Sequence, residues 1–203
     1  MNNILVISAL ALLSVSSCKK DTKALTKDTL NEKEKSDLIF LREEEKLAHD
    51  VYVFSFKKYN QTIFLNISSG EQNHMNSVLN LLTKYGVADP IQNQSEGVFQ
   101  NAILQQLYNQ LTAKSDSSLT KALEVGATIE DLDINDIKSF YVNTSNTDLT
   151  GVYDRLTCGS RNHLRSFISQ LLSNEITYTP QYITQIEFND IIASSNEQCG
   201  KNN

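Results

Sequence analysis

The chain has 203 residues, of which 40% are hydrophobic and 21% charged, and its formal net charge is -6. These values are typical of one soluble globular domain with room for a short appendage. A net negative chain lacks the basic face that nucleic acid needs, so nucleic acid is excluded as a partner. Two prolines and seven glycines are too few for the turns of an all-β fold and favour long helices.

The first 17 residues resemble the signal peptide of a bacterial lipoprotein. The apolar run of residues 4–15 has the length of a signal-peptide core and is too short to span a bilayer. Small residues, Val15-Ser16-Ser17, then precede Cys18, although residues 1–3 carry no basic side chain. By this resemblance Cys18 becomes the lipidated N-terminus, and the charged residues 18–35 form a tether. The alternative is a buried helix with a chance cysteine.

A lipidated Cys18 implies a location at the cell envelope, on the extracytoplasmic side, with the lipid as the only membrane attachment. The two other cysteines are Cys158 and Cys199. An oxidising compartment permits a disulfide between them, but the sequence leaves their pairing open. The absence of a CxxC pair excludes a rubredoxin-type iron centre and a thioredoxin-type motif.

The spacing of apolar residues predicts four long helices, with Ser36 as the N-cap of the first. A short link near Asn60 makes the first two helices antiparallel, and a long connection over residues 86–116 precedes the third. The expected helices are Ser36–Lys58, Thr62–Tyr85, Ser118–Tyr141 and Thr147–Leu172, with shorter ones at Val98–Leu111 and Ile183–Ala193. The prediction is an all-α four-helix bundle over residues 36–175, with one long crossover connection that contains a short extra helix. A tail follows over residues 176–203.

Acidic and imidazole side chains interrupt the apolar face of every long predicted helix. Pairs three residues apart point the same way, because a helix turns by about 100° per residue. The inward groups are Glu45 on the first helix, Glu71 and His74 on the second, Glu130 and Asp133 on the third, and His163 on the fourth.

Four carboxylates and two imidazoles are therefore expected in one core. A buried ionised carboxylate destabilises a fold by an amount on the order of several kcal/mol unless it is paired. We expect no inward Lys or Arg, since Arg161 and Arg165 point away from His163. Two divalent cations balance four negative charges, and neutral imidazoles complete the coordination, so the pattern predicts a di-metal carboxylate site.

Each of these residues also has a simpler interpretation. One glutamate among residues 42–46 is usually a solvated surface charge, and Glu44 is the second choice for the ligand from this helix. His49 is either an extra ligand or a histidine at the rim of the bundle. Asp133 could instead cap or pair with a backbone group, and an isolated His163 is typical of a satisfied core histidine. The combined pattern over four helices favours the metal site.

Four segments of the chain resemble one uncharacterised family. They are Leu41–Ala48 with Asp50–Tyr52, Ser69–Met75, Gly126–Ile134 and Gly159–Arg165. Together, within about residues 37–192, they are similar to a ferritin-like family called domain of unknown function 2202. The resemblance implies a bundle related to ferritins and rubrerythrins, in which Glu45, the Glu71-x-x-His74 pair and Glu130 belong to a ferritin-like iron site.

The fourth helix departs from the ferritin-like pattern. Where a second Glu-x-x-His is expected, the chain has Ser160-Arg161-Asn162-His163, so a bridging carboxylate is missing. We infer that Asp133, one turn along from Glu130, replaces it. If Asp133 does not point inward, only five ligands remain, and a single metal or a degraded site becomes plausible.

Oxygen and imidazole ligands without thiolate suit two iron ions, with manganese as the alternative. Tyr52 either hydrogen-bonds a ligand carboxylate, and so orients it, or is a core aromatic. The expected roles are terminal ligation by Glu45 and by Glu130 or Asp133, bridging by Glu71, and one imidazole, His74 or His163, on each metal.

Three functions fit these features. The first is a ferroxidase- or peroxidase-like oxidoreductase outside the cytoplasm, which acts on O₂ or H₂O₂ or oxidises Fe(II). Its partners would be a small-molecule oxidant and an external electron donor, and a homodimer is possible. The second is a metal-binding or sensing lipoprotein without turnover. The third is a structural helical bundle with a vestigial site.

Overall fold

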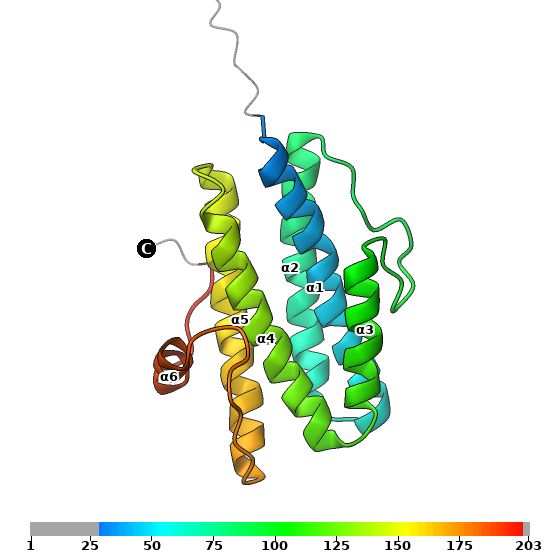
Figure 1. Cartoon of the computed structure of the whole chain (residues 1–203), viewed down its shortest axis with the longest axis vertical. Coiled ribbons are helices and arrows are strands. Elements are labelled where there is room, and N and C mark those ends of the chain that lie inside the picture. Colours follow the sequence, from blue (N-terminus) through cyan, green and yellow to red (C-terminus); the bar gives the residue numbers. More distant parts are fainter. Residues whose placement is uncertain (1–28, 201–203) are drawn as a thin grey trace, which may run out of the picture.

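The computed structural model describes residues 29–200, which form six helices and no strand (Figure 1). The all-α prediction is confirmed for this part of the chain, and no helix in it is long and apolar enough to cross a membrane. The predicted signal peptide, Cys18 and most of the predicted tether lie outside the described residues. The helices are α1 (Glu32–Tyr59), α2 (Thr62–Tyr85), α3 (Ala102–Ser115), α4 (Leu119–Tyr141), α5 (Thr147–Ser173) and α6 (Gln185–Ala193).

Helix α1 begins earlier than the sequence predicts. Its N-cap is Asn31 rather than Ser36: the Asn31 side chain accepts a hydrogen bond from the Glu34 N–H at 2.9 Å. The Glu34 carboxylate accepts one from the Asn31 N–H at 2.8 Å, which completes a capping box. Residues 32–35, expected in the tether, therefore form the first turn of α1. Their acidic side chains suit the positive end of the helix dipole.

The four long helices lie side by side as two antiparallel hairpins (Figure 1). Helix α1 packs on α2 and α4 packs on α5, while contacts of α1 with α4 and of α2 with α5 join the hairpins. In the short α1–α2 link Asn60 adopts a left-handed backbone, with φ of 50°. Helix α3 lies in the long crossover and contacts α1 and α4. This arrangement is compatible with the predicted four-helix bundle with an extra helix.

The connection between α2 and α3 covers one side of α1. The Glu43 carboxylate accepts hydrogen bonds from the backbone N–H groups of residues 100 and 101, at 2.6 and 2.9 Å. The Asp50 carboxylate accepts another from the Gly97 N–H at 2.9 Å. Acidic side chains of α1 thus bind a connection that has no regular secondary structure of its own.

Two basic side chains of α1 are buried, which corrects the expectation that none points inward. Arg42 and Lys46 are 3% and 2% exposed. Arg42 donates to both oxygens of Asp89, at 3.2 and 3.1 Å, and Lys46 forms an ion pair with Asp50. The helical wheel missed them because it assigns the side opposite the apolar stripe to water, whereas the α2–α3 connection covers that side.

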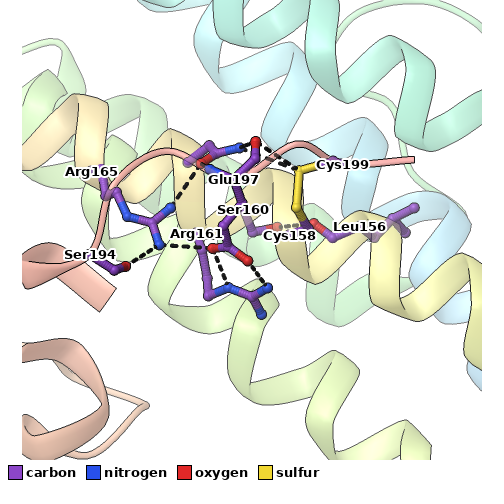
Figure 2. Close-up of a disulfide and its surroundings, with 9 residues drawn as sticks. Leu156, Cys158, Ser160, Arg161, Arg165, Ser194, Glu197 and Cys199 are labelled. Carbon is purple, nitrogen blue, oxygen red and sulfur yellow. Dashed lines mark hydrogen bonds and ion pairs between the residues drawn. A yellow bond between two sulfur atoms is a disulfide. The ribbon is translucent and has the colours of Figure 1, made fainter. Parts of the chain in front are cut away.

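The segment after α6 is fastened to α5 (Figure 2). A disulfide joins Cys158 to Cys199, with an S–S distance of 2.07 Å. Close by, the Glu197 carboxylate forms ion pairs with Arg161 and, at 2.8 Å, with Arg165. Residues 197–199 are therefore held along the part of α5 that carries the predicted histidine ligand.

We expect the Cys199→Ser variant to be less stable than the oxidised protein. The disulfide spans 41 residues of sequence, and the bond restricts the unfolded chain, which for loops of this size is worth roughly 2–4 kcal/mol. Urea denaturation should show a loss of that order in the free energy of unfolding. Reduced wild-type protein is the control and should match the variant. Equal stability of the variant and the oxidised protein would contradict this role.

Candidate metal centre

The six predicted ligands come from all four long helices of the bundle. The four carboxylates are at most 1% exposed, although a carboxylate is rarely buried without a partner. The two imidazoles are more accessible: the His74 and His163 side chains are 12% and 17% exposed. The ligands are Glu45 from α1, Glu71 and His74 from α2, Glu130 and Asp133 from α4, and His163 from α5.

Five of these side chains converge in two groups that share Glu71. One group is Glu45, Glu71 and His74, the other is Glu71, Glu130 and His163, and in each the ligand atoms lie within 4.8 Å of one another. Glu71 Oε2 is 2.8 Å from His74 Nδ1, and Glu71 Oε1 is 2.7 Å from His163 Nδ1. The other carboxylates are farther away: Glu45 Oε2 is 3.2 Å from His74 Nδ1, and Glu130 Oε2 is 3.5 Å from His163 Nδ1.

The Glu71 carboxylate has short contacts but no hydrogen bond. Neither of its oxygens has a hydrogen-bond partner, and neither has His163 Nδ1, despite the distances of 2.7 and 2.8 Å. The groups are close, but they are not oriented as donor and acceptor. Buried polar atoms nearly always have partners, and a cation between these oxygens and nitrogens would supply them. The donor set therefore fits two hard or borderline metal ions.

Burial and mutual charge shift the pKa values of these groups strongly. Burial raises the pKa of Glu45 to about 7 against the influence of His74, and burial together with Glu71 raises the pKa of Glu130 to about 7. Burial favours the neutral form of His163, but Glu71 and Glu130 outweigh it and raise its pKa to about 10. For Glu71 the two imidazoles outweigh burial and lower the pKa. Without metal, protons on the imidazoles thus offset part of the negative charge.

We expect metal affinity to rise with pH. An imidazole nitrogen must lose its proton before it can bind a metal, and His163, with a pKa of about 10 in the metal-free protein, carries that proton at neutral pH. For each proton that the metal ion displaces, the metal affinity rises by up to about tenfold per pH unit. Titration calorimetry with Mn²⁺ between about pH 6 and pH 8, in buffers of different ionisation enthalpy, should detect this proton release. Affinity that does not change with pH would contradict it.

Two helix glycines make room for the imidazoles. A Cβ atom at Gly70 on α2 would lie 2.8 Å from His163 Nε2, and one at Gly159 on α5 would overlap His74 Nε2. Each histidine ring therefore packs against a glycine of the facing helix, and the two rings stack with centroids 5.6 Å apart. Sequence reasoning missed this role. The available signal was a glycine in the middle of a helix, where alanine has the higher helix propensity.

Tyr52 interacts directly with one ligand carboxylate. Its hydroxyl donates a hydrogen bond to Glu130 Oε1 at 2.6 Å and lies 3.3 Å from the Gly126 carbonyl oxygen. Its ring packs against Phe167, with centroids 5.3 Å apart. The side chain is thus both a core aromatic and a donor that fixes the orientation of Glu130.

The other predicted candidates lie outside the two groups. His49 contacts the Asp50 carboxylate, with Nδ1 at 2.9 Å, on the side of α1 that binds the connection. Glu44 and Asp133 are buried, but neither belongs to a group with an imidazole. Ser160, at the position of the missing carboxylate, donates to the Leu156 carbonyl oxygen at 3.1 Å.

Comparison with known proteins places the chain in a family without an assigned activity. Residues 34–195 match the family described as "Uncharacterized protein domain (DUF2202)". The chain is 48% identical over 175 residues to "Uncharacterized protein MJ0754" of Methanocaldococcus jannaschii, covering 86% of this chain and 95% of that protein. It is also similar to the crystal structure of hypothetical protein MJ0754 from Methanococcus jannaschii, with a TM-score of 0.83, 48% identity and coverage of 86% and 99% of the two chains. The chain therefore belongs to the DUF2202 family.

Proposed function

We propose that the chain is a ferritin-like protein that binds two divalent metal ions, iron or manganese, between its four long helices. The single observation that carries this proposal is the Glu71 carboxylate, which presents one oxygen to each imidazole and has no hydrogen-bond partner. Such a carboxylate is suited to bridge two cations. Facing helices of a bundle commonly supply di-metal ligands in this way.

The roles of the ligands follow from the two groups. Glu45 and His74 would hold one ion, Glu130 and His163 the other, and Glu71 would contact both. Tyr52 donates to Glu130 and so keeps the other oxygen of that carboxylate directed at the site.

A pair of iron ions would supply two electrons to O₂ or H₂O₂, or would be the place where Fe(II) is oxidised. The residues of the chain would hold the two ions and shield them from bulk water. The carboxylates of Glu45, Glu71 and Glu130 are fully buried, so bulk water has little access to them. His74 and His163 are the more exposed ligands, so a small oxidant would reach the ions past these imidazoles. Electrons for repeated turnover would come from an external donor.

We further propose that the protein works outside the cytoplasm, anchored through Cys18. The Cys158–Cys199 disulfide supports this location because such bonds persist in oxidising compartments. A Cys18→Ser variant expressed in a bacterial host should leave the membrane fraction, whereas the parent chain should stay in it. Equal partition of both proteins would contradict the anchor.

The oxidoreductase proposal is tested by anaerobic loading with Fe(II), followed by O₂ or H₂O₂. We expect Fe(II) oxidation at a rate that falls at least tenfold in the His74→Ala variant, with further cycles when an electron donor is added. Loading without any oxidation beyond the rate in buffer would contradict catalysis.

A non-catalytic metal-binding role is the second candidate. Ser160 favours this role. It stands where a second bridging carboxylate would be expected, and its hydroxyl donates a hydrogen bond to the Leu156 carbonyl oxygen of its own helix. Tight binding of two ions without turnover in the same experiment would support this candidate. Absence of binding would instead leave a structural bundle.

A further inference from the structure

A groove of about 790 Å³ lies between α2 and α5. Its volume is within the range of roughly 300–1,000 Å³ that is typical of small-molecule sites. Helix α6 and the segment after it contribute Ile192 and residues 194–196 to the lining. The two long helices contribute Ile63, Asn66 and Ile67 from α2 and, among others, Ser166, Ile168 and Ser169 from α5.

Two glycine contacts show how α2 and α5 run past each other. Gly70 of α2 faces His163 of α5, and Gly159 of α5 faces His74 of α2. Four residues forward on α2 thus correspond to four residues back on α5, so the two helices are antiparallel. Residues before Gly70 on α2 therefore face residues after His163 on α5.

The groove begins one helical turn from the candidate ligand His163. Ile67 comes three residues before Gly70, Ser166 comes three residues after His163, and both line the groove. Three residues of helix correspond to a rise of about 4.5 Å. A molecule in the groove would therefore lie close to the His163 ring, whose Nδ1 is 2.7 Å from Glu71 Oε1.

The lining combines apolar and neutral polar side chains. Ile67 and Ile168 are buried, each 5% exposed, and present apolar surface to the groove. Asn66, Ser169 and Gln170 are exposed, and within residues 29–200 their side chains have no hydrogen-bond partner. Their amide and hydroxyl groups are therefore available to a ligand.

Of the described residues that line the groove, only Arg165 is charged, and its guanidinium is already bonded. Its Nε donates to the Ile191 carbonyl oxygen and its Nη1 to Asn162, both at 2.8 Å. Its Nη2 donates to Ser194 at 2.7 Å and to Glu197 at 2.8 Å (Figure 2). An anionic ligand would find no free cation here, so the groove suits a neutral molecule with an apolar body and polar substituents.

We propose that this groove binds a hydroquinone, the reduced form of a neutral aromatic electron donor. A hydroquinone has an apolar ring and two hydroxyl groups, which match the isoleucines and the free polar side chains. Its oxidation to the quinone releases two electrons and two protons. The electrons would return two Fe(III) ions of the centre to Fe(II), and the protons would pass to water. The donor role rests on the proposed function, whereas binding in the groove does not.

The test titrates the full chain, supplied with redox-inert Zn²⁺, with duroquinol (tetramethylhydroquinone) and follows the isoleucine methyl groups by NMR without oxygen. The methyl groups of Ile67 and Ile168 should shift, whereas that of Ile137, in the other core cluster, should not. Ascorbate, an anionic donor, should cause no shift.

Variants on both walls locate the binding site. Asn66→Trp and Ser169→Trp place an indole in the groove and should each weaken duroquinol binding by roughly tenfold or more. Gln72→Trp is the matched control, because Gln72 is an exposed residue of α2 that bonds Asn76 and does not line the groove. Circular dichroism verifies that each variant is folded.

The outcomes separate this proposal from the proposed function. Absence of shifts at Ile67 and Ile168, wild-type binding in both tryptophan variants, or equally tight binding of ascorbate would overturn it. Metal binding without duroquinol binding would overturn the groove site and leave the metal centre intact. Duroquinol binding in the groove of a chain that binds no metal would support the site while it contradicts the proposed function.

Discussion

The Glu71→Gln variant is expected to lose both metal ions together. Glutamine keeps the volume of the side chain, but it replaces one oxygen by an NH₂ group, which cannot bind a cation, and it removes the negative charge that both ions share. Because each Glu71 oxygen contacts a different imidazole, at 2.8 Å for His74 and 2.7 Å for His163, one substitution affects both halves of the site. We expect Mn²⁺ affinity to fall by roughly 100-fold or more, beyond the effect of losing a group that only supports a ligand.

Single histidine variants provide the contrast. His74→Ala and His163→Ala should each weaken mainly one ion and leave the other measurable by equilibrium dialysis with Mn²⁺. Glu124, an acid of α4, forms an ion pair with Lys121 away from the site, so the Glu124→Gln variant should behave as the wild type. If Glu71→Gln still binds two ions with wild-type affinity, Glu71 is not the bridge, and the pairing of ligands described above is wrong.

The Gly159→Ala variant is expected to weaken the His74 half of the site. The new methyl group would overlap His74 Nε2, so the ring must move away from the position in which Nδ1 faces Glu45 and Glu71. We expect a loss of metal affinity of roughly tenfold or more at that ion, since even displaced supporting groups have such effects.

Gly151→Ala is the matched control on the same helix. The nearest atom to its added Cβ is Arg155 Nη1 at 3.8 Å, so alanine fits and should stabilise α5 by about 0.5–1 kcal/mol through helix propensity. Thermal unfolding and Mn²⁺ titration of both variants measure the two effects. A Gly159→Ala protein that gains the same stability and binds metal normally would show that the close packing on His74 is unimportant.

The sequence predicts the inward-pointing ligands well, because the direction of a side chain on a helix depends only on its angular position around the helix axis. Glu71 and His74, three residues apart, point the same way on any helix, and the structure brings them together with Glu45. The lengths of the links between the helices predict the connectivity, and the match to the DUF2202 family covers residues 34–195. Glu130 and His163 are predicted in the same way, from their angular positions on the apolar faces of their helices.

The features that the sequence does not predict depend on contacts between distant segments of the chain. Gly70 and Gly159 matter because each faces a histidine of another helix, which no single-helix pattern reveals. Arg42 and Lys46 are buried because the connection covers the polar side of α1, and a helical wheel has no information about such a cover. The predicted start of α1 at Ser36 is wrong, because charged residues suit a tether and a helix N-terminus equally well.

The central claim is that cations compensate the buried acids of this bundle. The most direct test is the metal content of protein purified without added metal from its own host, combined with its thermal unfolding before and after removal of metal by a chelator. We predict two or more equivalents of iron or manganese per chain, and an unfolding temperature that falls on chelation and recovers when Mn²⁺ is restored. Protein that contains no metal, and whose unfolding temperature does not respond to chelator, Fe²⁺ or Mn²⁺, would contradict the account.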